Sequence, residues 1–123
     1  MALDERTILK HMLNVDTPGA YDWKIGLWTT GWTGNNAATL PTYEVASSRV
    51  ALPAMTWNAG TTSYNMSADL YFGPLAALSV QGWFIAKGAG NDTVYVGTFA
   101  SPVATTAGDY LKLPAGYVGL GLL

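Results

Sequence analysis

The chain has 123 residues, of which 50% are hydrophobic and only 11% are charged, and its formal net charge is −2. This length suits a single domain, and the six Lys and Arg residues are spread singly, whereas a nucleic-acid duplex requires clustered cations. The absence of cysteine excludes disulfides and thiolate metal sites, and no apolar run approaches the ~18 residues of a membrane span.

Residues 1–20 are expected to form an amino-terminal arm that contains one short α-helix. Asp4 suits the N-cap position, and four apolar residues then recur at helical spacing and form one stripe: Ile8, Leu9, Met12 and Leu13. A helix of about ten residues is marginal alone, so we expect these side chains to be buried as protein–protein contacts, either on the same chain or on a neighbour. The charges near this terminus do not fit a signal peptide, which indicates synthesis in a cytoplasm.

Residues 21–123 are expected to form one β-domain. The segment 23–30 predicts a strand, 31–40 a polar loop that carries Trp32, 42–52 a broken strand, and 54–57 a short strand. The clearest pattern follows in S-Y-N-M-S-A-D-L-Y-F-G-P (63–74), where every even position from Tyr64 to Phe72 is apolar. This period of two predicts one central strand with Leu70 and Phe72 buried, ended by Gly73-Pro74 because proline cannot donate to the ladder.

The carboxyl-terminal half continues the β pattern. Further strands are predicted at 78–86, 93–99, 110–113 and 117–122. The run W-F-I-A (83–86) indicates burial on both faces, and the turn residues 88–92 predict a hairpin. About 7–8 short strands separated by turns indicate an all-β protein, an antiparallel two-sheet sandwich or jelly roll.

Catalytic residue types are sparse and scattered. His11 is the one histidine of the sequence, and the carboxylates occur singly in the β region, where nucleophilic or paired-carboxylate catalysis would need them grouped. We therefore expect no enzyme activity, no cofactor and no metal. Trp28, Trp32 and Tyr43 flank the polar loop and suit a platform on which a glycan stacks, but we favour core packing by Trp28 and subunit contact by Trp32.

Several segments together resemble a family of small phage virion proteins that are often labelled phage tail fibre proteins. The matching segments, in order, are I-G-L-W-T-T (25–30), R-V-A-L-P-A-M-T-W (49–57), N-M-S-A-D-L-Y-F-G-P (65–74), V-Q-G-W-F-I-A (80–86), V-Y-V-G-T-F (94–99) and A-G-D-Y-L-K-L-P-A-G (107–116). In size and type the chain is also similar to the cement or decoration proteins that coat tailed-phage heads.

The resemblance implies a non-enzymatic structural protein of a tailed-phage virion, made in the host cytoplasm. We expect a capsid cement protein that binds the major capsid protein or other virion proteins and self-associates as a dimer or trimer, without nucleic acid or membrane. The alternative is a tail-fibre or baseplate module that binds a host-surface glycan, and a third reading is a lectin-like domain unrelated to phage.

Overall fold

The computed structural model describes residues 22–33, 37–46, 48–60, 63–91 and 93–120. The chain is mostly β, with 58% strand and 4% helix, and all of the strand pairings found in the described ranges are antiparallel. The expected all-β, antiparallel class is therefore confirmed. The predicted amino-terminal helix, with Ile8, Leu9, Met12 and Leu13, lies outside the described residues.

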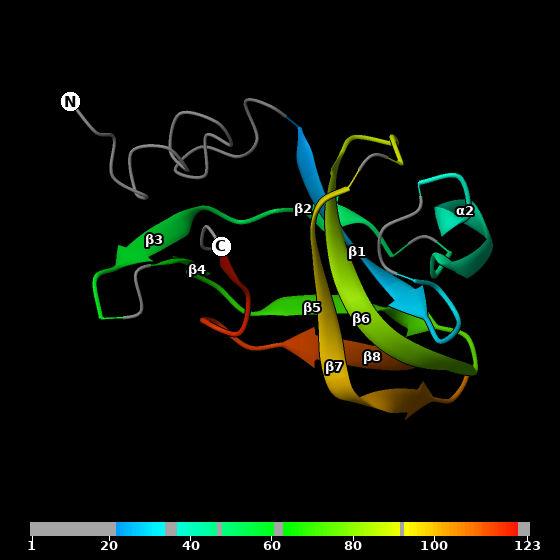
Figure 1. Cartoon of the computed structure of the whole chain (residues 1–123). Coiled ribbons are helices and arrows are strands. Elements are labelled where there is room, and N and C mark those ends of the chain that lie inside the picture. The colour runs from blue at the N-terminus through cyan, green and yellow to red at the C-terminus, as the bar shows by residue number, and fades with distance from the viewer. Residues whose placement is uncertain (1–21, 34–36, 47, 61–62, 92, 121–123) are drawn as a thin grey trace.

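The described elements are nine strands and one helical turn (Figure 1): β1 (Trp23–Thr29), α2 (Leu40–Tyr43), β2 (Val50–Ala51), β3 (Met55–Asn58), β4 (Ser63–Met66), β5 (Leu70–Leu75), β6 (Leu78–Lys87), β7 (Thr93–Thr105), β8 (Asp109–Leu113) and β9 (Gly119–Leu120). They form three sheets in the orders β2-β1-β6-β7, β3-β4-β9 and β5-β8. Because the described strands divide among three sheets, the expected two-sheet sandwich or jelly roll is not confirmed.

Two long chain segments, β5 followed by β6 and β7 followed by β8, pair with each other and bend together at one corner. The β6–β7 ladder ends at the pair Leu78 and Thr105, and the β5–β8 ladder resumes at Leu75 and Asp109 after two short connections. The buried Thr105 hydroxyl fixes this corner because it donates to the Ala76 carbonyl at 2.7 Å and accepts from the Leu78 N–H at 3.2 Å. Figure 1 shows β5 and β8 running across β6 and β7.

Both faces of the four-stranded sheet are buried. One face contributes Ile25, Leu27 and Ile85 to the main core, which it shares with residues of the other two sheets. The opposite face carries Phe84 and other residues of a second cluster under α2, whose buried members are Trp28, Trp32, Leu40, Phe84 and Ala86. The burial of all four residues of W-F-I-A confirms the prediction made from that run.

The stretch 63–74 is divided where a single strand was predicted. Tyr64 and Phe72 are fully buried as expected, and Leu70 is partly buried against the core, but β4 and β5 belong to different sheets. Between them the Ser67 hydroxyl donates to the Ala54 carbonyl and the Asp69 carboxylate accepts from the Ala115 N–H. These contacts between residues distant in sequence hold the connection between β4 and β5.

Two further boundaries differ from the predictions. Gly73-Pro74 does not end β5, which continues to Leu75 through a register shift, the setting in which a strand accommodates proline. The predicted broken strand 42–52 begins within the turn α2, with Pro41 in its first turn, where the missing N–H is harmless. Of the residues described in this range, Glu44 forms an isolated bridge with Trp28 and Val50–Ala51 forms a strand.

The carboxyl-terminal strands keep their predicted places with altered lengths. The hairpin between β6 and β7 forms as expected, but β7 extends to Thr105 rather than ending at Phe99. Its register shifts opposite Val80 and Gly82, and the Gln81 side-chain amide donates to the Phe99 carbonyl at 2.9 Å across this bulge. The bulge lets the strand continue past Phe99 while it bends.

Candidate interaction surface

The predicted stacking residues around the polar loop lie in the interior. Trp28 is 3% exposed and Trp32 is 5% exposed, and their rings meet edge to face with centroids 5.3 Å apart. The Trp28 Nε1–H donates to the Trp83 carbonyl at 3.1 Å. Tyr43 is half-buried against the same cluster, so the structure brings the three residues together as packing and leaves neither indole with an open face for a sugar.

An open apolar groove of about 400 Å³ lies between β7, β8 and the turn that follows β8. Its lining is apolar except for one ammonium group and the tyrosine hydroxyls, and consists of Phe99, Val103, Tyr110, Leu111, Lys112, Leu113, Pro114 and Tyr117. Phe99, Leu111 and Leu113 form its buried floor. The rim is exposed, with Tyr110 at 63%, Tyr117 at 48% and Val103 at 40%.

The groove is bordered by two strand edges. β7 is the last strand of the four-stranded sheet and β8 is the last strand of the two-stranded sheet, and in the described ranges no further strand pairs beyond either of them. An edge strand presents backbone donors and acceptors to a partner. Exposed aromatic side chains beside two such edges are typical of a protein contact.

The turn that forms one wall of the groove is held by Asp69. Its Oδ1 accepts the Ala115 N–H at 2.7 Å, and its Oδ2 lies 3.4 Å from Lys112 Nζ. The pKa of Asp69 lies below its ordinary value, chiefly because of the Ala115 hydrogen bond; desolvation opposes the shift, and the positive charge and hydrogen bond of Lys112 add to it. Tyr117 then packs on Phe99, with ring centroids 6.1 Å apart.

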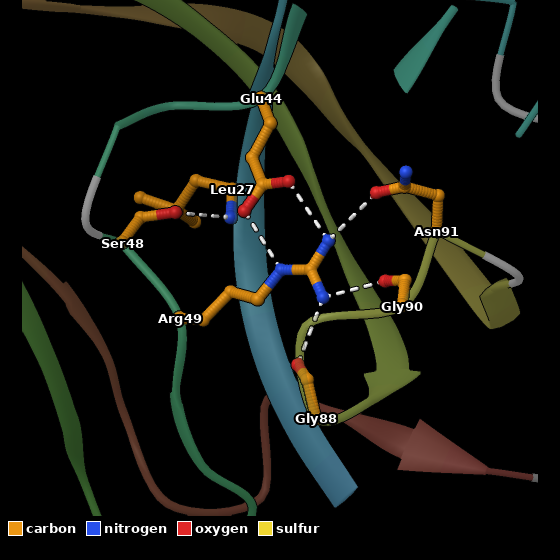
Figure 2. A network of polar contacts seen from close by, with 7 residues as sticks. All are labelled: Leu27, Glu44, Ser48, Arg49, Gly88, Gly90 and Asn91. Carbon is orange, nitrogen blue, oxygen red and sulfur yellow. Dashed lines mark hydrogen bonds and ion pairs between the residues drawn. The ribbon is translucent and has the colours of Figure 1, made fainter. Parts of the chain in front are cut away.

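A second polar cluster, around Arg49, is a structural tie (Figure 2). The Arg49 guanidinium donates to both Glu44 carboxylate oxygens at 2.7 and 2.8 Å, to the Gly88 and Gly90 carbonyls at 2.9 and 2.6 Å, and to Asn91 Oδ1 at 3.3 Å. These five contacts use all five N–H donors of an arginine. The cluster therefore joins residues 44–49 to the β6–β7 hairpin and has no donor left for an anion.

Two neighbouring contacts secure the same segment. The Ser48 hydroxyl is buried and accepts the Leu27 N–H at 3.1 Å. The Arg49 guanidinium also lies over the Phe84 ring, 5.0 Å from its centroid. Because these contacts join residues distant in sequence, the pattern S-S-R within a predicted broken strand gave no signal for them.

The described residues offer no cluster of side chains that could hold a metal ion. Among them, no three His, Asp or Glu side chains gather as ligands of an ion would. Within these same ranges, no helix has the length and apolar character to cross a membrane. The chemistry available at the groove is thus apolar burial with tyrosine hydrogen bonds at the rim.

Comparison with protein-family models, with curated proteins and with solved structures gives no match for this chain. The fold and the groove alone define the class, an antiparallel β-protein with an open apolar groove. The sequence predictions missed this surface, although the alternation D-Y-L-K-L places Tyr110 and Lys112 outward from the buried Leu111 and Leu113. From this alternation the exposure of Tyr110, which forms part of the rim, was predictable.

Proposed function

We propose that the chain is a non-enzymatic structural component of a tailed-phage virion, a capsid cement or decoration protein that binds and stabilises the lattice of the major capsid protein. The observation that carries the proposal is the β7–β8 groove, because its exposed rim is tyrosine and valine in a chain with only 11% charged residues. Interfaces are enriched in such aromatic residues and depleted of most charged ones.

The mechanism is reinforcement of a protein shell by many weak contacts. Each copy bridges neighbouring subunits and adds interface area, and most of the binding energy comes from a few aromatic side chains that become desolvated. Tyr110 and Tyr117 are the residues of this type at the groove. The motif A-G-D-Y-L-K-L-P-A-G, part of the resemblance to small phage virion proteins, supplies β8 and most of the groove lining.

The finer fold that we propose is a jelly roll. The ribbon of β6 and β7 that continues into β5 and β8 across a sharp corner supports this arrangement, since jelly rolls wrap long paired strands into two facing layers. A rigid sandwich of this kind suits a protein that presents a surface and performs no chemistry.

The second candidate function is a tail-fibre or baseplate module that binds a host-surface glycan. The exposed rings of Tyr110 and Tyr117 beside the groove favour it, since an amphipathic aromatic ring suits a wet, partly apolar contact. We place the glycan at this site and not at Trp28, Trp32 and Tyr43, because the indoles of the two tryptophans are buried.

Copy number in purified virions separates the two functions. We would quantify peptides of this chain against peptides of the major capsid protein by mass spectrometry with isotope-labelled standards. A cement protein is expected at a number comparable to that of the capsid protein, whereas a fibre protein follows the small symmetry of the tail. A count that matches the tail, or absence of the chain from the particle, would overturn the cement function.

A further inference from the structure

We propose that β7 is a dimerisation strand, whose outer edge pairs antiparallel with β7 of a second copy of this chain about a two-fold axis. The pairing joins two copies of the four-stranded sheet into one continuous sheet. The inference goes beyond the proposed function, because it states how copies of the chain associate with each other and not what the β7–β8 groove binds.

Contacts on the far side of β1 show which way the backbone groups of this sheet point. The Leu27 carbonyl accepts the Val45 N–H, and the Leu27 N–H donates to the Ser48 hydroxyl, so Leu27 bonds away from β6. Backbone groups alternate in direction along an antiparallel strand, so the adjacent Gly26 bonds toward β6. Its partner there is Phe84, which therefore bonds toward β1.

The same alternation gives two residues of β7 outward backbone groups. Trp83, adjacent to Phe84, bonds toward β7, where its partner is Gly97. Gly97 thus bonds toward β6, whereas Val96 and Thr98 on either side direct their N–H and C=O groups to the outer edge of the sheet. Among the described residues, no strand pairs with that edge, and no backbone hydrogen bond from a turn or loop reaches either residue.

The outer edge of β7 lacks the usual protection against another strand. The 13 residues of β7, T-V-Y-V-G-T-F-A-S-P-V-A-T, contain no charged side chain, and Pro102 lies beyond Thr98, where the register shifts. Charges, prolines and short length are features that keep edge strands from pairing. The segment around Gly97 therefore presents a ladder that another strand can extend.

This strand is complementary to itself. In an antiparallel pair centred on Gly97, Val96 of each copy faces Thr98 of the other, so the outward N–H and C=O groups of all four residues are paired. Because β7 is uncharged, the two-fold axis brings no like charges face to face, which would be destabilising. A two-fold interface uses the same patch on both subunits, and two-fold dimers are the commonest oligomers.

The other sheet edges in the described ranges match this edge less well. β2 and β9 have 2 residues each and β3 has 4, whereas β8 carries Asp109 and Lys112 and β5 contains Pro74. Two copies therefore pair through β7 on both sides, which closes a dimer. Pairing through two different edges would instead continue into a ring or a filament.

Amide hydrogen exchange of the full-length protein tests the contact directly, with exchange carried out at a high and at a low protein concentration and read by NMR. We expect the Val96 and Thr98 amides to exchange slowly in the concentrated sample and at least about tenfold faster after dilution, because dilution separates the copies by mass action. The Gly97 amide is the internal control and is expected to stay protected, since it bonds to β6 of the same copy.

A charge placed on the edge tests the same contact by a second route. Thr98 is exposed, so Thr98→Lys is expected to keep the fold while it brings two ammonium groups together across the axis. The matched control is Thr42→Lys, because Thr42 is exposed on α2. By sedimentation we expect a dimer for wild type and for the control, and a dimer–monomer midpoint at least about tenfold higher for Thr98→Lys.

Three outcomes would overturn the inference. One is a wild-type chain that stays monomeric at all concentrations, which would leave the edge to a strand of another protein. The second is a dimer in which the Val96 and Thr98 amides are unprotected, and the third is an equal midpoint for Thr98→Lys and Thr42→Lys. The proposed function is read separately, from copy number in purified virions, so a monomeric chain present there at the number of the capsid protein retains the function and loses this inference.

Discussion

Arg49 shows how a single side chain holds distant parts of this protein together. The Arg49 side chain is only 14% exposed and that of its partner Glu44 is 20% exposed. The same guanidinium donates hydrogen bonds to the carbonyls of Gly88 and Gly90. Since its five donors all have acceptors, removal of the guanidinium leaves a carboxylate and two carbonyls without their partner.

We expect Arg49→Met to lower the free energy of unfolding by about 3 kcal/mol, the lower end of the range for breaking a buried ion pair, because the pair is not fully buried. Urea unfolding followed by tryptophan fluorescence measures the change. Lys24→Met is the control: its ion pair with Asp22 is more exposed, and such pairs contribute only about 0–1 kcal/mol. Equal effects of the two variants would show that the Arg49 tie is not structural.

Tyr64 presents the opposite case, a buried hydroxyl to which no partner is assigned among the described residues. Its ring is buried in the core and packs against the Trp57 ring, with centroids 5.2 Å apart. We expect Tyr64→Phe to leave the free energy of unfolding unchanged or raise it by up to about 1 kcal/mol, because an unsatisfied buried hydroxyl costs about that much or more. A loss above about 1 kcal/mol in urea unfolding would show that the hydroxyl has a partner.

Asp69 makes the turn beside the groove sensitive to acid. A carboxylate whose folded-state pKa is lowered stabilises the fold above its unfolded pKa, near 3.8, and this stabilisation is lost as the pH falls through the lower folded value. We expect Asp69→Asn to be less stable than wild type at pH 7 and the difference to shrink below pH 3.8. Urea midpoints at pH 7 and pH 3 measure it, and a difference that grows on acidification would contradict the assignment.

At the scale of elements, two glycines allow tryptophans to lie flat on the four-stranded sheet. Trp83 pairs with Gly97 and Trp28 pairs with Gly82, and a Cβ at either glycine would collide with the indole or with backbone. Because Trp83 belongs to the main core and Trp28 to the cluster under α2, the glycines serve both faces of the sheet. Aromatic cover of a strand glycine compensates for its missing side chain.

Gly97→Ala is therefore expected to lower the free energy of unfolding by about 1–3 kcal/mol, the usual cost of overpacking, with a change in tryptophan fluorescence as the Trp83 indole moves. Gly60→Ala in the turn after β3 is the control, because its nearest neighbour is the flexible end of the Asn58 side chain. A Gly97→Ala variant as stable as wild type would show that the indole does not rest on this glycine.

The sequence predicted well those elements whose partners are local or whose burial is uniform. The strand at 23–30, the W-F-I-A run and the β6–β7 hairpin follow from apolar residues and turn residues in one short window. The stretch 63–74 was mistaken for one strand because its period of two persists across Ser67–Asp69. Within the break, the Ala115 N–H donates a hydrogen bond to the Asp69 carboxylate, a contact between residues distant in sequence that no local pattern reveals.

The candidate surface was largely hidden from sequence reasoning for a similar reason. Its floor joins Phe99 of β7 to Leu111 and Leu113 of β8 across a corner, and the bulge in β7 that bends the strand there leaves no signature in the sequence. The tryptophans at and beside the loop for which glycan stacking was considered, Trp32 and Trp28, are buried. Residue type alone does not separate a buried tryptophan from an exposed one.

At the scale of the whole molecule, the described residues form a well-packed β-scaffold with an open apolar groove. Polar groups such as those of Arg49, Ser48 and Thr105 are used internally, whereas tyrosines remain exposed around the β7–β8 groove. Apolar groups gathered at an exposed groove mark an interaction site. In the function that we propose, another virion protein covers this surface.

Cryo-microscopy of the virion that contains this chain tests the central claim most directly. The account predicts density for this β-fold at regular positions on the capsid shell, with the rings of Tyr110 and Tyr117 covered by another polypeptide. Density for the chain in which the β7–β8 groove faces open solvent would contradict the claim that this groove is the contact surface. Density confined to the tail would contradict the cement function.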